Sequence, residues 1–120
     1  MEQKRVVITG IGAVSCVGNN VPAMWDSLVN GRCGIDKVTI FDATTCKTQI
    51  AGEVKNFEAT DFMDVKDARR FDSYAIFAIA ALHEALNDAG LPNDFRNEGS
   101  PVEPERVGVI VGSGIGGMRT

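Results

Sequence analysis

Few side chains in this sequence are suited to catalysis, and they are widely spaced. The three cysteines are Cys16, Cys33 and Cys46, and the only histidine is His83. A cysteine becomes a nucleophile when a base or a helix N-terminus stabilises its thiolate. No histidine is close in sequence to any of the three; Cys16 precedes an expected helix by several residues. These residues therefore predict no complete catalytic set, and His83 is interpreted as structural.

Two glycine turns are candidates for binding a ligand. Gly10 and Gly12 follow a β-branched run, as in a dinucleotide-binding loop. That loop needs a third glycine and a helix that starts at once. Here position 15 is serine and the helix is expected only near Pro22, so nucleotide binding stays the weaker alternative. The second turn, residues 112–117, lacks the Lys-Ser/Thr ending of a phosphate loop, and close backbone packing is its simpler interpretation.

Three basic residues form another candidate site. Lys66, Arg69 and Arg70 are spaced i, i+3, i+4, which places them on one face of a helix. An acidic partner or a phosphate would fit that face. The alternative is a solvated face neutralised by nearby acids, which are Asp64, Asp67 and Asp72.

The element expected to organise the chain is a helix from Ser73 to about Ala89. Asp72 or Ser73 caps its start, and Gly90 closes its end in a left-handed conformation. Residues 74–82 are apolar without interruption, so every face of the helix is apolar. Such a helix is enclosed by other layers, and this run is far shorter than the roughly 20 residues of a membrane span.

The remaining elements predict an α/β fold with parallel strand pairing. Residues 5–9 and 106–111 are expected to be buried strands, each followed by a glycine turn. A short helix is expected at 23–30, shorter strands at 36–41 and 49–54, an exposed helix and turn at 57–70, and a surface loop at 92–104. The short helix is expected to pack Trp25, Leu28 and Val29 inward.

Composition narrows the class of protein. A chain of 120 residues with 44% apolar residues suits one domain. The formal charge of −4, with acids and bases interspersed, argues against nucleic-acid or anionic-membrane binding. Three cysteines without a CxxC pair indicate a reducing compartment, and argue against a disulfide framework or zinc site. No cluster of His, Asp or Glu has metal-ligand spacing.

An ordered series of motifs resembles the start of the β-ketoacyl-[acyl-carrier-protein] synthases, closest to the long-chain type of bacterial fatty-acid synthesis. The motifs are Arg5-Val-Val-Ile-Thr-Gly-Ile-Gly12, Ser15, Val17-Gly18, Trp25-x-x-Leu28-x-x-Gly31, Gly34-Ile35, Phe41-Asp42, Ala51-Gly52-x-Val54-x-x-Phe57, Arg69-x-x-Asp72, Ala85-Leu-x-Asp-Ala-Gly-Leu91 and Gly112-Ser-Gly-Ile-Gly-Gly117. The series spans essentially the whole chain. A polyketide ketosynthase or the related synthase I is the less favoured relative.

This resemblance implies a thiolase-like α/β fold with αβαβα layers, of which residues 1–120 would be an incomplete N-terminal part. It further implies a cytoplasmic homodimer without cofactors, whose partner is acyl carrier protein in acyl- and malonyl-loaded forms. The family's reaction is a decarboxylating Claisen condensation. A cysteine takes an acyl chain from the carrier, and two histidines assist decarboxylation of the malonyl group. Those three residues are expected beyond Thr120, so no catalytic residue is assigned here and the chain alone is expected to be inactive.

The resemblance also assigns two features residue by residue. Lys66, Arg69 and Arg70 match basic residues that contact the acidic carrier protein, which favours the docking interpretation. Ile115 matches a residue that lines or gates the acyl-chain pocket. The open alternative is a noncatalytic carrier-binding module. We expect the chain to fold poorly by itself, because 120 residues hardly supply the layers that the apolar helix needs.

Overall fold

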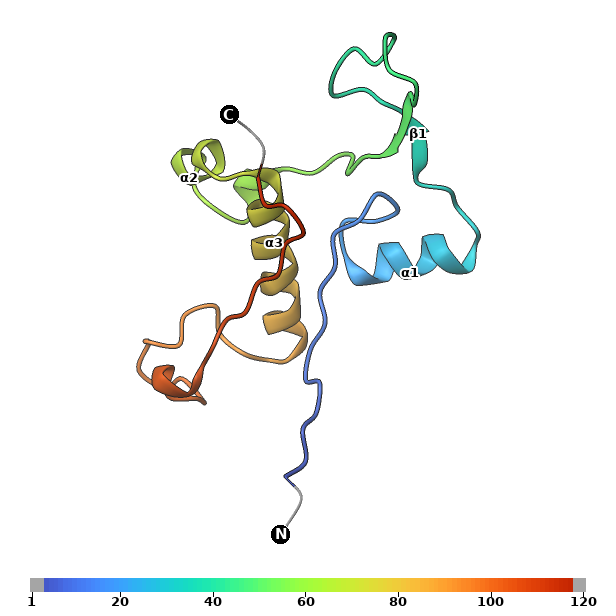
Figure 1. Cartoon of the computed structure of the whole chain (residues 1–120). Coiled ribbons are helices and arrows are strands. Elements are labelled where there is room, and N and C mark those ends of the chain that lie inside the picture. Colours follow the sequence, from blue (N-terminus) through green and yellow to red (C-terminus); the bar gives the residue numbers. More distant parts are fainter. Residues whose placement is uncertain (1–3, 118–120) are drawn as a thin grey trace.

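The computed structural model describes residues 4–117 and combines three α-helices with one two-stranded sheet (Figure 1). The elements in chain order are α1 (Val21–Val29), β1 (Ile35–Lys37), β2 (Ile50–Gly52), the 3-10 helix η1 (Ala59–Asp61), α2 (Val65–Arg70), α3 (Ser73–Asp88) and the 3-10 helix η2 (Pro104–Arg106). The helix and turn predicted at 57–70 correspond to η1 and α2, which cover 59–61 and 65–70 of that range. The predicted loop at 92–104 is present, with η2 starting at its end.

Helix α3 confirms the central prediction from sequence. It ends in the expected left-handed glycine, Gly90, whose φ is +67°. The N–H of Gly90 donates to the carbonyl of Asn87 at 3.1 Å, and the N–H of Leu91 donates to that of Leu86 at 2.8 Å. This pair of bonds is the Schellman arrangement, which satisfies carbonyls that would otherwise lack partners at a helix end. Asp72 occupies the N-cap position, but its side chain makes no capping hydrogen bond.

The core is small and centred on α3. Ile76, Ala80 and Ala43 are the only buried apolar residues among those described. The radius of gyration is 17.6 Å, whereas a compact domain of this length has about 14 Å. The prediction that α3 is enclosed on every side is therefore only partly met, because Tyr74 and Leu82 remain 44% and 40% exposed. The described residues supply no second layer to cover them.

The predicted strands at 5–9 and 106–111 are wrong as strands in this structure. Both segments are extended but lie outside any sheet, apart from Arg106, which belongs to η2. Val6 is 95% exposed and Ile110 is 97% exposed, so neither run is buried. A strand exists only when a neighbour completes its hydrogen-bond ladder, and no such neighbour is present for either segment within residues 4–117. The expected parallel pairing is accordingly not observed there either.

The N-terminal segment instead runs along α3 and touches its backbone (Figure 1). A Cβ built on Gly10 would collide with the carbonyl oxygen of Ala85, and one on Gly12 would collide with that of Ala81. Glycine at these two positions lets the two backbones approach more closely than any other residue would allow. Close backbone packing was the interpretation given to the second turn, residues 112–117, but it is found here at the first. In the second turn a Cβ on Gly112, Gly114 or Gly116 would meet no atom within 4 Å.

The two short strands expected from sequence form a hairpin. β1 pairs with β2 in antiparallel register, with Ile35 opposite Gly52 and Lys37 opposite Ile50. Both are shorter than the predicted ranges of 36–41 and 49–54. The long connection is closed at its base by Glu53, which is buried and accepts hydrogen bonds from the N–H and hydroxyl of Thr39 at 2.8 and 2.6 Å.

Helix α1 forms where it was expected, but its apolar face is exposed. The Asn20 side chain caps it by accepting from the N–H of Ala23 at 2.8 Å. Trp25, Leu28 and Val29 were predicted to pack inward, yet they are 66%, 54% and 66% exposed. Their i, i+3, i+4 spacing does place them on one side of the helix. The prediction fails because nothing among the described residues packs against that side.

Candidate functional site

The basic residues of α2 form the most distinct polar surface that the sequence predicted. Lys66, Arg69 and Arg70 all lie within the helix, and all three are exposed. None of them makes an ion pair with a residue between 4 and 117. Arg69 and Arg70 occupy the last turn, where a positive charge complements the helix dipole. Three charges are therefore presented to solvent together.

The nearby acids do not neutralise this surface by direct pairing. Asp64 is the N-cap of α2, and its carboxylate accepts the N–H of Asp67 at 2.8 Å. Asp72 lies beyond the other end of α2, against the backbone of Gly117. The alternative interpretation of a locally neutralised face thus lacks the ion pairs that it would need, while the docking interpretation stays a prediction.

The second glycine turn brings Ile115 to the surface. Ile115 is 82% exposed, and the following Gly116 has a φ of +85° and donates its N–H to the Ser113 hydroxyl at 2.8 Å. Gly117 packs so tightly on Asp72 that a Cβ there would overlap the carboxylate. The turn is thereby held over the N-terminus of α3. The predicted contact between Ile115 and an acyl chain stays a prediction.

An apolar groove of about 650 Å³ lies between α3 and residues 109–112. Tyr74, Ala78 and Leu82 line one wall, and Val109 and Val111 line the other. The lining contains no charged side chain, so its chemistry suits hydrocarbon rather than a polar ligand. Ile115 is not among the lining residues.

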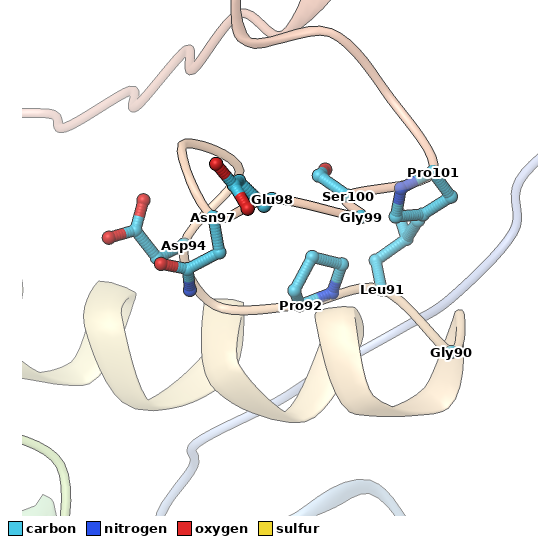
Figure 2. A pocket seen from close by; sticks show the side chains of 9 residues that line it. All are labelled: Gly90, Leu91, Pro92, Asp94, Asn97, Glu98, Gly99, Ser100 and Pro101. Carbon is cyan, nitrogen blue, oxygen red and sulfur yellow. The ribbon is translucent and has the colours of Figure 1, made fainter.

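A second hollow, of about 410 Å³, is formed within the loop that follows α3. Figure 2 shows its lining, which runs from Gly90 to Pro101 and includes Asp94, Asn97 and Glu98. Asp94 is paired with Arg96 through two charge-assisted bonds of 2.9 and 3.0 Å, and these bonds hold the pKa of Asp94 below its ordinary value. The lining contains neither a cysteine nor a histidine. The hollow therefore holds neither a thiol nor an imidazole, and the hydroxyl in its lining, that of Ser100, donates to the carbonyl of Val102 at 2.8 Å.

The cysteines and the histidine lie in separate environments. Cys33 and Cys46 are exposed, whereas Cys16 is half-buried; all three are free thiols. His83 stacks edge-on against Phe62, with ring centroids 6.1 Å apart. That packing supports the structural interpretation of His83. No group of three or more potential metal ligands occurs in the described part of the chain. Within residues 4–117 there is also no helix with the length and apolar character that crossing a membrane requires.

Three carboxylates that were not predicted from sequence hold backbone segments in place. Glu84 accepts the N–H groups of Ala13 and Val21 at 2.9 and 2.8 Å, and Asp88 accepts that of Ile11 at 3.0 Å. Glu53 acts similarly on Thr39. The only sequence signal was the i, i+4 spacing of Glu84 and Asp88, which places them on one face of α3.

Comparison with known proteins finds the same family over nearly the whole chain. The family profile described as "Beta-ketoacyl synthase, N-terminal domain" matches residues 3–120. Proteins named 3-oxoacyl-[acyl-carrier-protein] synthase 2 are 42% identical in a Synechocystis strain and 46% identical in Staphylococcus aureus strain COL, each over 99% of this chain. The protein of that name from Vibrio harveyi is 45% identical over 98% of the chain. The chain spans 27% of the length of each of these relatives.

A solved structure shows the same likeness in three dimensions. "The ishigamide ketosynthase/chain length factor" matches with a TM-score of 0.63 and 31% sequence identity. The match covers 72% of this chain and 21% of that one.

Proposed function

The chain belongs to the family of the β-ketoacyl synthase N-terminal domain, and from that premise we propose that it is the N-terminal part of a β-ketoacyl-[acyl-carrier-protein] synthase of fatty-acid elongation. Family membership confirms the thiolase-like α/β fold, of which this chain represents a portion. The supporting observation is identity of 42–47% to proteins named 3-oxoacyl-[acyl-carrier-protein] synthase 2 over almost the whole chain.

The proposed reaction is a decarboxylating condensation. A cysteine thiolate first takes the acyl group from the carrier thioester and releases the carrier thiol. Malonyl-carrier then loses CO₂, and the resulting carbanion attacks the acyl-enzyme thioester and expels the cysteine thiolate. The product is a β-ketoacyl-carrier two carbons longer. We assign the nucleophile and both histidines to positions beyond Thr120, and none of Cys16, Cys33, Cys46 or His83 to these roles.

The whole gene product provides the test of this activity. Purified enzyme is given acyl- and malonyl-carrier protein, and we expect CO₂ release together with a β-ketoacyl-carrier product. The same assay on the 120-residue chain should give neither. Absence of both products with the whole protein, under conditions in which it binds carrier, would favour the noncatalytic carrier-binding module instead.

The second candidate function is a polyketide ketosynthase, favoured by the likeness to the ishigamide ketosynthase structure. The two activities differ in what happens after the first condensation. A fatty-acid synthase should accept saturated acyl-carriers once the β-keto group has been reduced. A polyketide enzyme should extend substrates that retain keto groups or double bonds. Competition between the two substrate types distinguishes them.

We propose that the carrier protein docks on α2, and that the whole enzyme acts as a homodimer in the cytoplasm. The exposed and unpaired state of Lys66, Arg69 and Arg70 supports the docking proposal, because the carrier of this family is acidic. Charge complementarity of this kind governs the association rate and is weakened by salt.

A charge-reversal pair tests the docking surface. In the whole enzyme, Lys66→Glu with Arg69→Glu should weaken carrier binding about tenfold or more, since two attractive contacts become repulsive. The matched control is Lys47→Glu with Arg106→Glu, which makes the same charge change at two exposed positions away from α2. Equal affinity of the two double variants at moderate salt would remove the docking proposal while leaving the proposed reaction intact.

A further inference from the structure

Residues 13–20, here called the connecting loop, join the extended N-terminal segment to α1. One side chain of α3 holds both ends of this loop. One carboxylate oxygen of Glu84 accepts the N–H of Ala13 at 2.9 Å, and the other accepts the N–H of Val21 at 2.8 Å. Glu84 is half-buried. Each carboxylate oxygen therefore fixes one end of the loop, and bonds to a charged acceptor are stronger than neutral ones.

The other side of the connecting loop holds the β1–β2 hairpin. The Asn19 side chain donates to the carbonyl oxygens of Lys55 and Asn56 at 2.9 and 3.1 Å, just after β2. The Cys16 thiol fills a slot between two glycines of the hairpin region. A Cβ on Gly34 would lie 2.8 Å from this sulfur, and one on Gly52 would lie 2.9 Å from it.

Backbone hydrogen bonds within the connecting loop lie between these two contacts. Ser15 and Gly18 pair with each other through backbone bonds of 2.8 and 3.3 Å, which closes a tight turn around Cys16. The hairpin strands pack chiefly on each other, and Figure 1 shows them away from α3. The connecting loop thus contacts both α3 and the hairpin, and links the two.

We propose that the connecting loop positions the β1–β2 hairpin on α3, and that Glu84 is the positioning residue for this arrangement. Loss of the Glu84 carboxylate leaves two backbone N–H groups without their acceptor. The loop then shifts away from α3, and the Cys16 thiol leaves the slot between Gly34 and Gly52. This inference does not depend on the proposed catalytic function.

The cysteines of the chain provide a direct test. The whole gene product is labelled with N-ethylmaleimide, and the labelling rate of each thiol is followed by peptide mass spectrometry. Cys33 and Cys46 are exposed and serve as internal standards, while Cys16 is half-buried. Glu84→Ala should raise the Cys16 rate about tenfold relative to the two standards, because two bonds to a charged acceptor are lost.

The matched control is Asp88→Ala. Asp88 lies one turn further along α3 and holds Ile11, outside the connecting loop. Its loss removes a similar bond, so the Cys16 rate should stay within about twofold of the original. Asn19→Ala should instead raise the Cys16 rate while the amide of Val21 keeps its protection from hydrogen exchange, because the Glu84 bond survives.

Glu84→Gln keeps the test decisive if Glu84→Ala does not fold. Glutamine retains one acceptor oxygen, and its NH₂ group cannot accept the second bond. A smaller rise in Cys16 labelling, about threefold, is expected with Cys33 and Cys46 unchanged. The proposal is overturned if Glu84→Gln leaves the Cys16 rate unchanged, or if Asp88→Ala raises it as much as the Glu84 variants do.

Discussion

Gly12→Ala is expected to destabilise the protein, although replacing glycine by alanine ordinarily favours folding by restricting the unfolded chain. An added Cβ at this position would overlap the carbonyl oxygen of Ala81, and it would also lie 2.8 Å from the carbonyl carbon of Ala81 and 2.9 Å from the N of Ala85. All of these atoms belong to the backbone of α3. They cannot rotate away as a side chain would, so the N-terminal segment must separate from the helix.

The magnitude follows from two opposing terms. Overpacking of this kind costs about 1–3 kcal/mol, whereas replacing glycine by alanine restricts the unfolded chain and stabilises by about 0.4–1 kcal/mol. The net expectation is a loss of about 1–2 kcal/mol, which lowers the folding equilibrium constant by roughly five- to thirtyfold.

Gly108→Ala is the matched control, because Gly108 lies on the other extended segment. No atom lies within 4 Å of a Cβ built there, and its φ is outside the left-handed region. Because no overpacking arises at this position, only the restriction of the unfolded chain contributes. Gly108→Ala should therefore be neutral or stabilise by up to about 1 kcal/mol. Urea unfolding of the whole gene product, followed by circular dichroism, measures both variants. A midpoint for Gly12→Ala equal to or above that of Gly108→Ala would refute the claim that these two backbones are in contact.

Three further predictions concern other parts of the structure. The Thr39 hydroxyl and N–H hold the pKa of the Glu53 carboxyl below its ordinary value, so the ionised carboxylate stabilises the fold above about pH 4.3 and loses this effect as pH falls through the lowered pKa. Thr39→Val should therefore move the acid-unfolding midpoint to higher pH, and Thr48→Val, at an exposed position, should not. Ile76→Ala should cost about 2–5 kcal/mol and Ile76→Val about 0.5–1.5 kcal/mol in urea unfolding, because Ile76 is one of the few buried apolar residues described. Gly90→Ala should lower the melting temperature and Gly90→Asn should lower it less, since the φ of +67° suits asparagine better than alanine.

The elements that could be predicted from sequence are those whose hydrogen bonds are local. Helix α3 follows from its own apolar run and from Gly90, and α1 follows from Pro22 and its short amphipathic pattern. The bonds that define both helices join residues three or four apart, so a local pattern is sufficient evidence. The same reasoning could not establish the strands at 5–9 and 106–111, because a strand needs a partner that the local sequence does not specify.

The contacts that organise the loops could not be predicted from sequence either, because they join residues that are far apart along the chain. Glu84 bonds Ala13 across 71 residues and Val21 across 63 residues. From sequence, such a glutamate is indistinguishable from a solvated residue on a helix surface. Glu53 is likewise separated by 14 residues from Thr39. Carboxylates that accept backbone N–H groups become visible only when the two segments are placed in space.

The packing around α2, and not only its charge, favours the proposal that a partner docks on its basic surface. The chain before α2 is fixed to α3 by aromatic packing, in which Phe57 meets Phe62 at 5.5 Å and Phe77 at 5.1 Å. Phe77 belongs to α3, and Phe62 directly follows η1. A partner that binds Lys66 and Arg69 therefore contacts a helix whose preceding segment is already ordered, so binding pays less conformational entropy. Phe57→Ala should consequently weaken carrier binding without changing any charge, and its effect should persist at high salt whereas that of Lys66→Glu with Arg69→Glu should fade.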